Sequence, residues 1–373
     1  MTDSGASSPS STVVFAGGGS GGHLTPGLAI AEALSRRRPN VRSIFACSDR
    51  PIDATVLSAE DATFVPIPAR PPSLRPGRLL AFARGYRTSV RAARAALREH
   101  EPAVVVALGG FVAVPVVRAA RREGIPAVLM NLDDPPGKAN RWLARSCTHI
   151  WSAVPVSGRS FTREITGMPI RQRALAPDDV EICRTELGID PSKRVLLITG
   201  ASQGATSVNR FMQAFIAAHG DVLADWHVLH LAGDRDQATL ETAYSDAGID
   251  AQVLTYLPRM GLAWGSATVA ISRAGASSVA EASANAVPTM YFPYPYHRDQ
   301  HQARNAFPVV EAGAAMLASD HVDAEVNLRA HGPRLIALLS DEVEQATMID
   351  ILVKRLDIEA ADRIATRIEA MLA

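Results

Sequence analysis

Residues 12–34 read TVVFAGGGSGGHLTPGLAIAEAL, and this stretch decides the fold class. A short run of β-branched and apolar residues leads into a glycine-rich turn, and an alanine-rich stretch suited to a helix follows. Strand, glycine turn and helix in this order form the repeating unit of a parallel sheet covered by helices. We expect the helix to begin near Pro26, because proline suits the first turn of a helix.

The same unit recurs in both halves of the chain. It returns at 103–110, AVVVALGG, and starts again after residue 170 with RVLLITG at 194–200 and TVAIS at 268–272. Two such series predict an α/β protein with two Rossmann-like domains. We place a disordered tail at 1–11, an N-terminal domain at 12–168 and a C-terminal domain at 169–373. The helical segment at the C-terminus could pack on either domain.

Length and composition limit the class of protein. A chain of 373 residues exceeds what one hydrophobic core supports, and 47% apolar with 20% charged residues is typical of a globular protein. The 38 basic and 38 acidic side chains cancel, which argues against nucleic acid as a partner. Three widely spaced cysteines indicate neither a disulfide framework nor a zinc site and favour a reducing cytosol.

Membrane contact, on this sequence, has to be peripheral. The first eleven residues lack the order of a secretory signal, and no apolar run approaches the roughly 20 residues of a membrane span.

The first glycine loop, Gly17 to His23, predicts a site for anions or polar oxygens. Glycines allow close approach to the backbone, and the N–H groups of the following helix attract negative charge. The same loop satisfies G-x-G-x-x-G, so it could equally mark a nicotinamide or flavin domain with Asp49 as a ribose ligand.

The second half adds two further strand–turn–helix loops, GASQGA at 200–205 and SRAGASS at 272–278. A dehydrogenase needs only one such fold, so the pair favours a different nucleotide enzyme. The helix after Ser278 would direct N–H donors at a diphosphate, and Glu281, about one turn later, could reach ribose hydroxyls. Ser-x-x-Glu is also a capping-box pattern, which is the structural alternative for these two residues.

Together these motifs resemble the MurG family of glycosyltransferases over almost the whole chain. The stretches that carry the resemblance are GGGSGGHLTPGLAIAEAL at 17–34, ALGGFVAVP at 107–115, GMPIR at 167–171, GASQGA, SRAGASSVAEASANAVPTMYFPYP at 272–295 and HQARNA at 301–306. The family has two Rossmann-like domains of the GT-B type that face each other across a cleft. It transfers N-acetylglucosamine from UDP-GlcNAc to lipid I, which gives lipid II for peptidoglycan.

The resemblance implies a set of positions that bind the UDP-sugar donor. They are Ser20, Gly21, Gly22, Arg171, Ser202, Leu257, Ala276, Ser277, Ser278, Val279, Ala280, Glu281, His301 and Gln302. Among them, Arg171 is implied near the phosphates, Leu257 against the uracil, and His301 with Gln302 at the sugar. A histidine in a helix is otherwise more often structural or solvent-exposed.

His23 is the candidate base. It follows the glycine loop, and a neutral imidazole can accept the proton of an attacking hydroxyl. A hydrogen bond at the helix start is the simpler interpretation of this residue.

The resemblance fails at one place. Where the family carries His-Glu-Gln-Asn before Pro-Gly, this chain reads MNLDDPPG at 130–137, so Met130 and Asp133 replace the histidine and the asparagine. We expect Asp133 or Asp134 to take over a polar or base role, and a plain Asp-Asp-Pro turn is the alternative. Donor-sugar identity and acceptor handling depend on this segment.

The segment 70–94 combines several arginines with leucine, phenylalanine and tyrosine, as in surfaces that meet anionic lipid headgroups. A solvated helix face packed on the core is the alternative.

We therefore predict an inverting, metal-independent transfer without a cofactor, at the cytoplasmic face of the bacterial inner membrane, with an undecaprenyl-linked acceptor. Backbone donors and Arg171 would stabilise the charge on the leaving diphosphate. A glycolipid synthase, a sugar epimerase or a silent homologue in cell-wall assembly are the rival functions.

Overall fold

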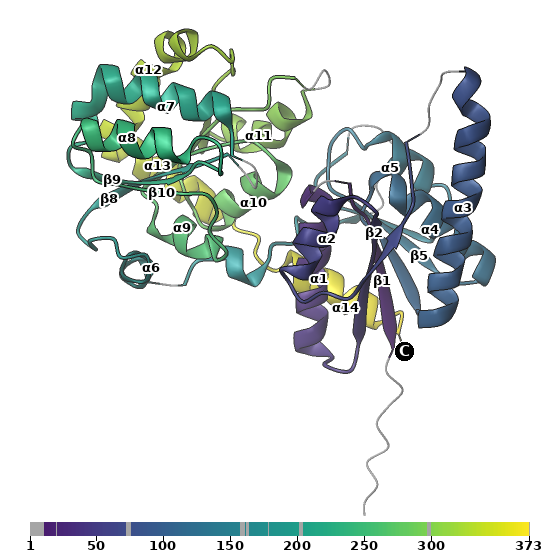
Figure 1. Cartoon of the computed structure of the whole chain (residues 1–373). Helices are drawn as coiled ribbons and strands as arrows, with labels where there is room; N and C mark the ends of the chain where they lie inside the picture. Colours follow the sequence, from purple (N-terminus) through teal and green to yellow (C-terminus); the bar gives the residue numbers. More distant parts are fainter. Residues whose placement is uncertain are drawn as a thin grey trace, which may run out of the picture. The chain divides into compact units, whose positions relative to one another are not determined.

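The computed structural model describes residues 11–372 except 20, 72–75, 157–160, 162–163, 178, 201–203 and 297–299, and within helices it leaves out the side chains of 21 and 76–80. The chain divides into two compact units, residues 1–171 with 359–373 and residues 172–358. Each unit is a parallel sheet between helices, as Figure 1 shows. The predicted fold class, two Rossmann-like α/β domains, is confirmed.

The first unit contains seven parallel strands in the order β3-β2-β1-β4-β5-β6-β7. The strands are β1 (Thr12–Ala16), β2 (Arg42–Ser48), β3 (Phe64–Ile67), β4 (Val104–Ala107), β5 (Ala127–Asn131), β6 (His149–Ser152) and β7 (Glu164–Ile165). The helices are α1 (Gly21–Arg37), α2 (Pro51–Ser58), α3 (Pro76–His100), α4 (Gly110–Glu123), α5 (Lys138–Leu143) and α14 (Ala360–Glu369).

Alternation along β1 explains the two layers of this unit. Val13 and Phe15 are buried against α1, α2 and α14, whereas Val14 and Ala16 are buried against α3 and α4. A strand that is apolar on both faces is typical of a parallel sheet covered on both sides. The last helix, whose place the sequence left open, packs on α1, where Arg36 and Asp362 form an ion pair of 3.0 Å.

Helix α1 begins at Gly21 rather than near Pro26, so that prediction is wrong. The two glycines before His23 have no side chains that would oppose helical entry, and Pro26 lies buried in the second turn. The earlier start brings His23 into the first turn of the helix.

The second unit contains six parallel strands in the order β10-β9-β8-β11-β12-β13. The strands are β8 (Arg194–Thr199), β9 (Trp226–Leu231), β10 (Ala251–Leu254), β11 (Val269–Ser272), β12 (Thr289–Tyr291) and β13 (Ala315–Leu317). The helices are α6 (Val180–Glu186), α7 (Thr206–His219), α8 (Gln237–Asp246), α9 (Met260–Ser266), α10 (Ala276–Ala284), α11 (His301–Glu311), α12 (Ala324–Ser340) and α13 (Glu342–Lys354), with short 3-10 helices at Gln172–Ala174 and Gly220–Leu223.

Along β8 the side chains again alternate between two cores. Leu196 and Ile198 pack with α7, α8 and α12, whereas Val195 and Leu197 pack with α9 and α10. None of the described helices is long and apolar enough to cross a membrane.

Candidate functional site

The strand order of each sheet marks where a ligand would bind. In the first sheet the connections run in opposite directions on the two sides of the β1–β4 pair, and in the second sheet they do so at the β8–β11 pair. In open α/β sheets, ligands bind outside the carboxyl ends of the strands at such a switch point. Both glycine loops of the second half and the first loop of the chain follow these strands.

In the first unit, two glycine turns lie against each other at the switch point. A side chain added at Gly110 (φ 75°) would place its Cβ 2.7 Å from the carbonyl oxygen of Gly18. A Cβ at Gly109 (φ 110°) would lie 3.1 Å from Cδ2 of His23. The turn after β4 therefore needs glycine at both positions, and the imidazole of His23 packs against this turn. Gly21 and Gly22 open α1, whereas Ser20 lies outside the described residues.

The surroundings of His23 favour the neutral imidazole. Burial lowers the pKa of His23 below its ordinary value of 6.5, while the negative charges of Asp133 and Asp53 act in the opposite direction. A histidine with a lowered pKa is unprotonated at neutral pH and can accept a proton. These surroundings suit the predicted base.

The segment after β5 brings Asp133 close enough to act on His23 by its charge. Asn131 fixes the backbone of Asp133. Its side-chain amide donates to the Asp133 carbonyl at 2.8 Å and to Ser152 Oγ at 3.0 Å. Asn131 is fully buried and accepts a 3.0 Å hydrogen bond from Asn140. Asp133 and Asp134 themselves are partly buried.

Met130 occupies a core position of β5. It is fully buried, and its sulfur lies 3.8 Å from Thr166 Oγ1. A methionine at this place fills the core.

Arg171 ends the first unit and is paired within it. The guanidinium donates to Glu32 of α1 through Nε at 2.8 Å and to Glu60 through Nη2 at 2.6 Å, and the residue is 7% exposed. Two carboxylates already balance its charge. The implied contact with donor phosphates stays a prediction, and it would compete with these pairs.

In the second unit, the loop after β8 is closely packed where it is described. Gly204 has a φ of 70°, and a Cβ there would lie 2.1 Å from the carbonyl oxygen of Ala232. Ser202 lies outside the described residues.

The loop after β11 leads directly into α10. Gly275 is the N-cap residue, and no side chain caps this helix end. Ser278 therefore lies inside the first turn and is not a cap, so the capping-box interpretation of Ser278 and Glu281 is wrong. Glu281 instead accepts a 3.2 Å hydrogen bond from the indole of Trp264.

The first helical hydrogen bond of α10 runs from Val279 N to Gly275 O. The N–H groups of Ala276, Ser277 and Ser278 precede it and, as in any first turn, have no acceptor within the helix. Together with the positive end of the helix they form a suitable place for an anion. Ala280 continues the same helix.

A buried arginine that sequence reasoning missed holds this loop in place. Arg273, 7% exposed, pairs with Asp320 at 2.7 Å and donates to Phe292 O at 2.9 Å and to Ser207 Oγ at 2.7 Å. These partners follow β12 and β13 or begin α7, so one side chain links the carboxyl ends of several strands. Its place in the SRAG motif was the only signal for it.

The remaining expected donor positions lie on two segments of the second unit. Leu257 is partly buried between β10 and α9. His301 and Gln302 begin α11, and Gln302 Oε1 accepts from the backbone N of Tyr294 at 2.8 Å. Gln302 thus ties the segment after β12 to the start of α11.

An Asp-x-Asp triplet occurs at 234–236, a pattern that can bind divalent cations. Asp236 accepts a 2.8 Å hydrogen bond from Asn209, which also contacts the buried His230 at 3.1 Å. Asp236 is thus part of a side-chain network at the start of α8. Among the described residues there is no group of three or more histidine, cysteine or acidic side chains placed to hold a metal ion.

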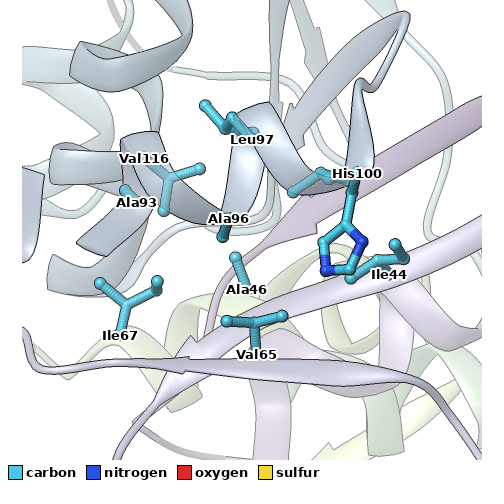
Figure 2. A pocket seen from close by; sticks show the side chains of 10 residues that line it. Ile44, Ala46, Val65, Ile67, Ala93, Ala96, Leu97, His100 and Val116 are labelled. Atoms are coloured by element: carbon cyan, nitrogen blue, oxygen red, sulfur yellow. The ribbon is translucent and has the colours of Figure 1, made fainter. Parts of the chain in front are cut away.

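An apolar pocket of about 630 Å³ lies in the first unit. Residues of α3, α4 and α5 line it together with the segment after β3, and they include Phe82, Tyr86, Phe111 and Trp142. Arg70 and Lys138 also line the pocket. A second cavity of about 10 Å³ lies between α3 and the sheet, with His100 among its lining residues (Figure 2). A cavity of this size holds no more than one water molecule.

Comparison with known proteins places the two units in one family. The model of the glycosyltransferase family 28 N-terminal domain matches residues 13–152, and that of the C-terminal domain matches residues 195–347.

Curated relatives match nearly the full length of the chain. One from Mycolicibacterium smegmatis is 35% identical over 90% of this chain and 88% of its own, and one from Nocardioides sp. is 37% identical over 83% and 84%. Both are named UDP-N-acetylglucosamine--N-acetylmuramyl-(pentapeptide) pyrophosphoryl-undecaprenol N-acetylglucosamine transferase. The crystal structure of MurG from Acinetobacter baumannii shares the fold, with a TM-score of 0.72 and 22% identity over 96% of this chain and 99% of that one.

Proposed function

The chain belongs to glycosyltransferase family 28, and from this premise we propose that it transfers N-acetylglucosamine from UDP-GlcNAc to lipid I. The product is lipid II for peptidoglycan. The observation that carries the proposal is that relatives with this activity in their names match both units of the chain, at 35% identity in one case. A glycolipid synthase, an epimerase or a silent homologue has no comparable support.

The donor binds through the second unit in this proposal. The first turn of α10 directs three backbone N–H groups toward the diphosphate, and Arg273 fixes the loop that carries them. Preorganised amides and the helix dipole stabilise the negative charge that grows on the leaving diphosphate. Glu281 takes the ribose, Leu257 meets the uracil, and His301 with Gln302 reaches the sugar.

The acceptor binds at the switch point of the first unit. The 4-hydroxyl of the acceptor sugar attacks the anomeric carbon, the bond to the diphosphate breaks, and His23 takes the hydroxyl proton. One displacement of this kind inverts the anomeric configuration. Asp133 stabilises the imidazolium that forms, since its charge already acts on His23.

We place the enzyme at the cytoplasmic face of the inner membrane, with anionic lipid as a partner of the segment 70–94. The apolar pocket of about 630 Å³ supports this, since α3 forms one of its walls and Arg70 lies among its lining residues. Aromatic side chains continue along it, with Phe82 and Tyr86 ring centres 6.2 Å apart and Tyr86 and Trp142 6.4 Å apart. Apolar side chains beside arginines suit the boundary between headgroups and acyl chains.

Isothermal calorimetry with UDP tests the donor site. We expect binding by the wild-type chain and a loss of affinity in Ser278→Pro, because proline removes one of the three amide donors of the first turn. Ser278→Ala, which removes the hydroxyl but keeps the backbone N–H, is the matched control. Absence of heat with UDP in the wild type would contradict the proposal.

Vesicle co-sedimentation tests the membrane part. Phe82→Ser with Trp142→Ser should reduce binding to anionic vesicles, whereas Val343→Ser, which changes a 78% exposed side chain of α13, should not. Equal binding of both variants would refute the assignment of this surface.

A further inference from the structure

A buried carboxylate beside the first glycine loop takes no part in the mechanism above. Asp53, in the first turn of α2, is 0% exposed. It accepts hydrogen bonds from Gly19 N at 2.8 and 3.0 Å, from Ser48 N at 3.0 Å and from Ser48 Oγ at 2.6 Å. Buried carboxylates are expensive unless they are well hydrogen-bonded, and these donors provide that compensation.

Asp53 fixes the glycine loop from one side. Gly18 has a φ of 147°, and a Cβ there would lie 2.3 Å from Oδ2 of Asp53, so the backbone touches the carboxylate. The carbonyl group of Gly19 is also fixed, because Arg50 Nη1 donates a hydrogen bond to Gly19 O at 3.1 Å. Loops of this kind usually direct such an amide at a bound phosphate. Here the chain supplies its own anion at that place.

The loop in turn positions the base. Gly18 O lies against Gly110, and the adjacent Gly109 lies against the imidazole of His23. A shift of Gly18 and Gly19 would therefore move both the start of α1 and the turn on which His23 rests.

We propose that Asp53 is a positioning residue of the transfer reaction, and that its carboxylate replaces a bound phosphate behind the first glycine loop. The inference rests on the proposed function for its reaction. Because Asp53 accepts the N–H of Gly19, this amide does not bind the donor diphosphate. The loop instead presents His23 to an acceptor hydroxyl.

Kinetics of Asp53→Asn test this, with Asp61→Asn as the matched control. Both changes remove one negative charge, but Asp61 is an exposed residue just beyond α2. We expect kcat to fall about 100-fold in Asp53→Asn, as for a misplacement of about 1 Å, with KM for UDP-GlcNAc unchanged. Asp61→Asn should behave as the wild type. An unchanged kcat in Asp53→Asn, or an equal loss of UDP affinity, would overturn the proposal.

If Asp53→Asn does not fold, Ser48→Ala decides, because it removes one donor to the carboxylate and leaves the charge in place. We expect about a tenfold fall in kcat, the size of one charge-assisted hydrogen bond. Wild-type kcat in this variant would contradict the assignment.

A second readout does not depend on turnover. The negative charges of Asp133 and Asp53 both raise the pKa of His23, so NMR titration of its imidazole should show a lower pKa in Asp53→Asn and no change in Asp61→Asn. If the wild-type chain bound UDP but made no product, the proposed reaction would fail while this titration still tested the placement of Asp53. An unaltered His23 titration in Asp53→Asn would refute that placement.

Discussion

At the residue scale, the proposed chemistry depends on an imidazole that is neutral at working pH. Burial lowers the pKa of His23 below 6.5, and Asp133 opposes the shift. A base works unprotonated, so activity should fall as the pH drops through this lowered pKa.

His23→Gln should lower kcat about 100- to 10,000-fold, the usual contribution of general base catalysis. UDP affinity should be unchanged, since the donor positions of α10 belong to the other unit. Steady-state kinetics with calorimetry measure both, and a variant that keeps wild-type kcat would exclude His23 as the base.

Asp133→Asn should move the acid limb of the pH–rate profile to still lower pH, because the change removes a charge that raises the pKa of His23. Asp134→Asn is the comparison. A limb that stays in place in Asp133→Asn would show that the carboxylate does not act on the base.

The sequence predicted residues of this kind only where a motif carried them. His23 and the α10 loop stood in glycine-rich stretches, whereas Asp53 and Asp320 did not. Asp53 meets Gly19 across 34 residues, and Asp320 meets Arg273 across 47. Pairings over such distances are fixed by the strand order of the sheet, which one sequence does not reveal.

At the element scale, the loop before α10 depends on a buried ion pair. Burial alone would raise the pKa of Asp320, but hydrogen bonds from Ser207 and Arg273 outweigh it and hold the pKa below 3.8. A carboxyl with a lowered pKa stabilises the fold at higher pH, and that contribution is lost as the pH falls through its folded-state pKa.

Arg273→Met should therefore lower the free energy of unfolding by about 3–5 kcal/mol at neutral pH, because Asp320 is left buried without its partner. Urea denaturation measures this change. The exposed Arg259–Glu186 pair offers a control, for which Arg259→Met should cost about 1 kcal/mol or less. Equal effects of the two variants would contradict the role given to Arg273.

Arg171 links α1, through Glu32, to the end of the first unit. Its role could be this structural link or contact with the donor phosphates, and one variant separates the two. If the link to Glu32 and Glu60 is its function, Arg171→Met should destabilise the chain by about 3 kcal/mol with UDP affinity unchanged. Weaker UDP binding at wild-type stability would instead support contact with donor phosphates. Denaturation and calorimetry on the same variant separate the outcomes.

The two wrong predictions of helix starts have a common cause. Proline and Ser-x-x-Glu favour helix starts at Pro26 and at Ser278, yet α1 begins at Gly21 and α10 follows the Gly275 cap. Glycine-rich turns let the backbone enter a helix early, and the sheet fixes where the turn ends.

At the scale of the whole molecule, the alternation of strands and helices was sufficient to predict two Rossmann-like domains. The alternation did not predict which elements belong to each unit. Helix α14 packs on the first unit, where Asp362 accepts a hydrogen bond from Arg36, 326 residues earlier in the chain. An amphipathic helix at a chain end carries no signal for the surface it covers.

Ile364→Ala should destabilise the first unit by about 2–5 kcal/mol, because the side chain is fully buried against the sheet. Differential scanning calorimetry should show that the first unit unfolds at a lower temperature in Ile364→Ala, while the unfolding temperature of the second unit is unchanged. Ile358→Ala, at a 49% exposed side chain, should have little effect. A parallel shift of both transitions would contradict the division into units.

The most direct measurement is transfer itself, with purified chain, lipid I and UDP-GlcNAc, and mass spectrometry of the lipid. We expect the lipid to gain one N-acetylhexosamine and UDP to be released in equal amount, with product formation at least about 100-fold slower in His23→Gln. UDP-glucose and UDP-galactose should give no product. Transfer from one of these in place of UDP-GlcNAc, or UDP release without a modified lipid, would contradict the proposed function.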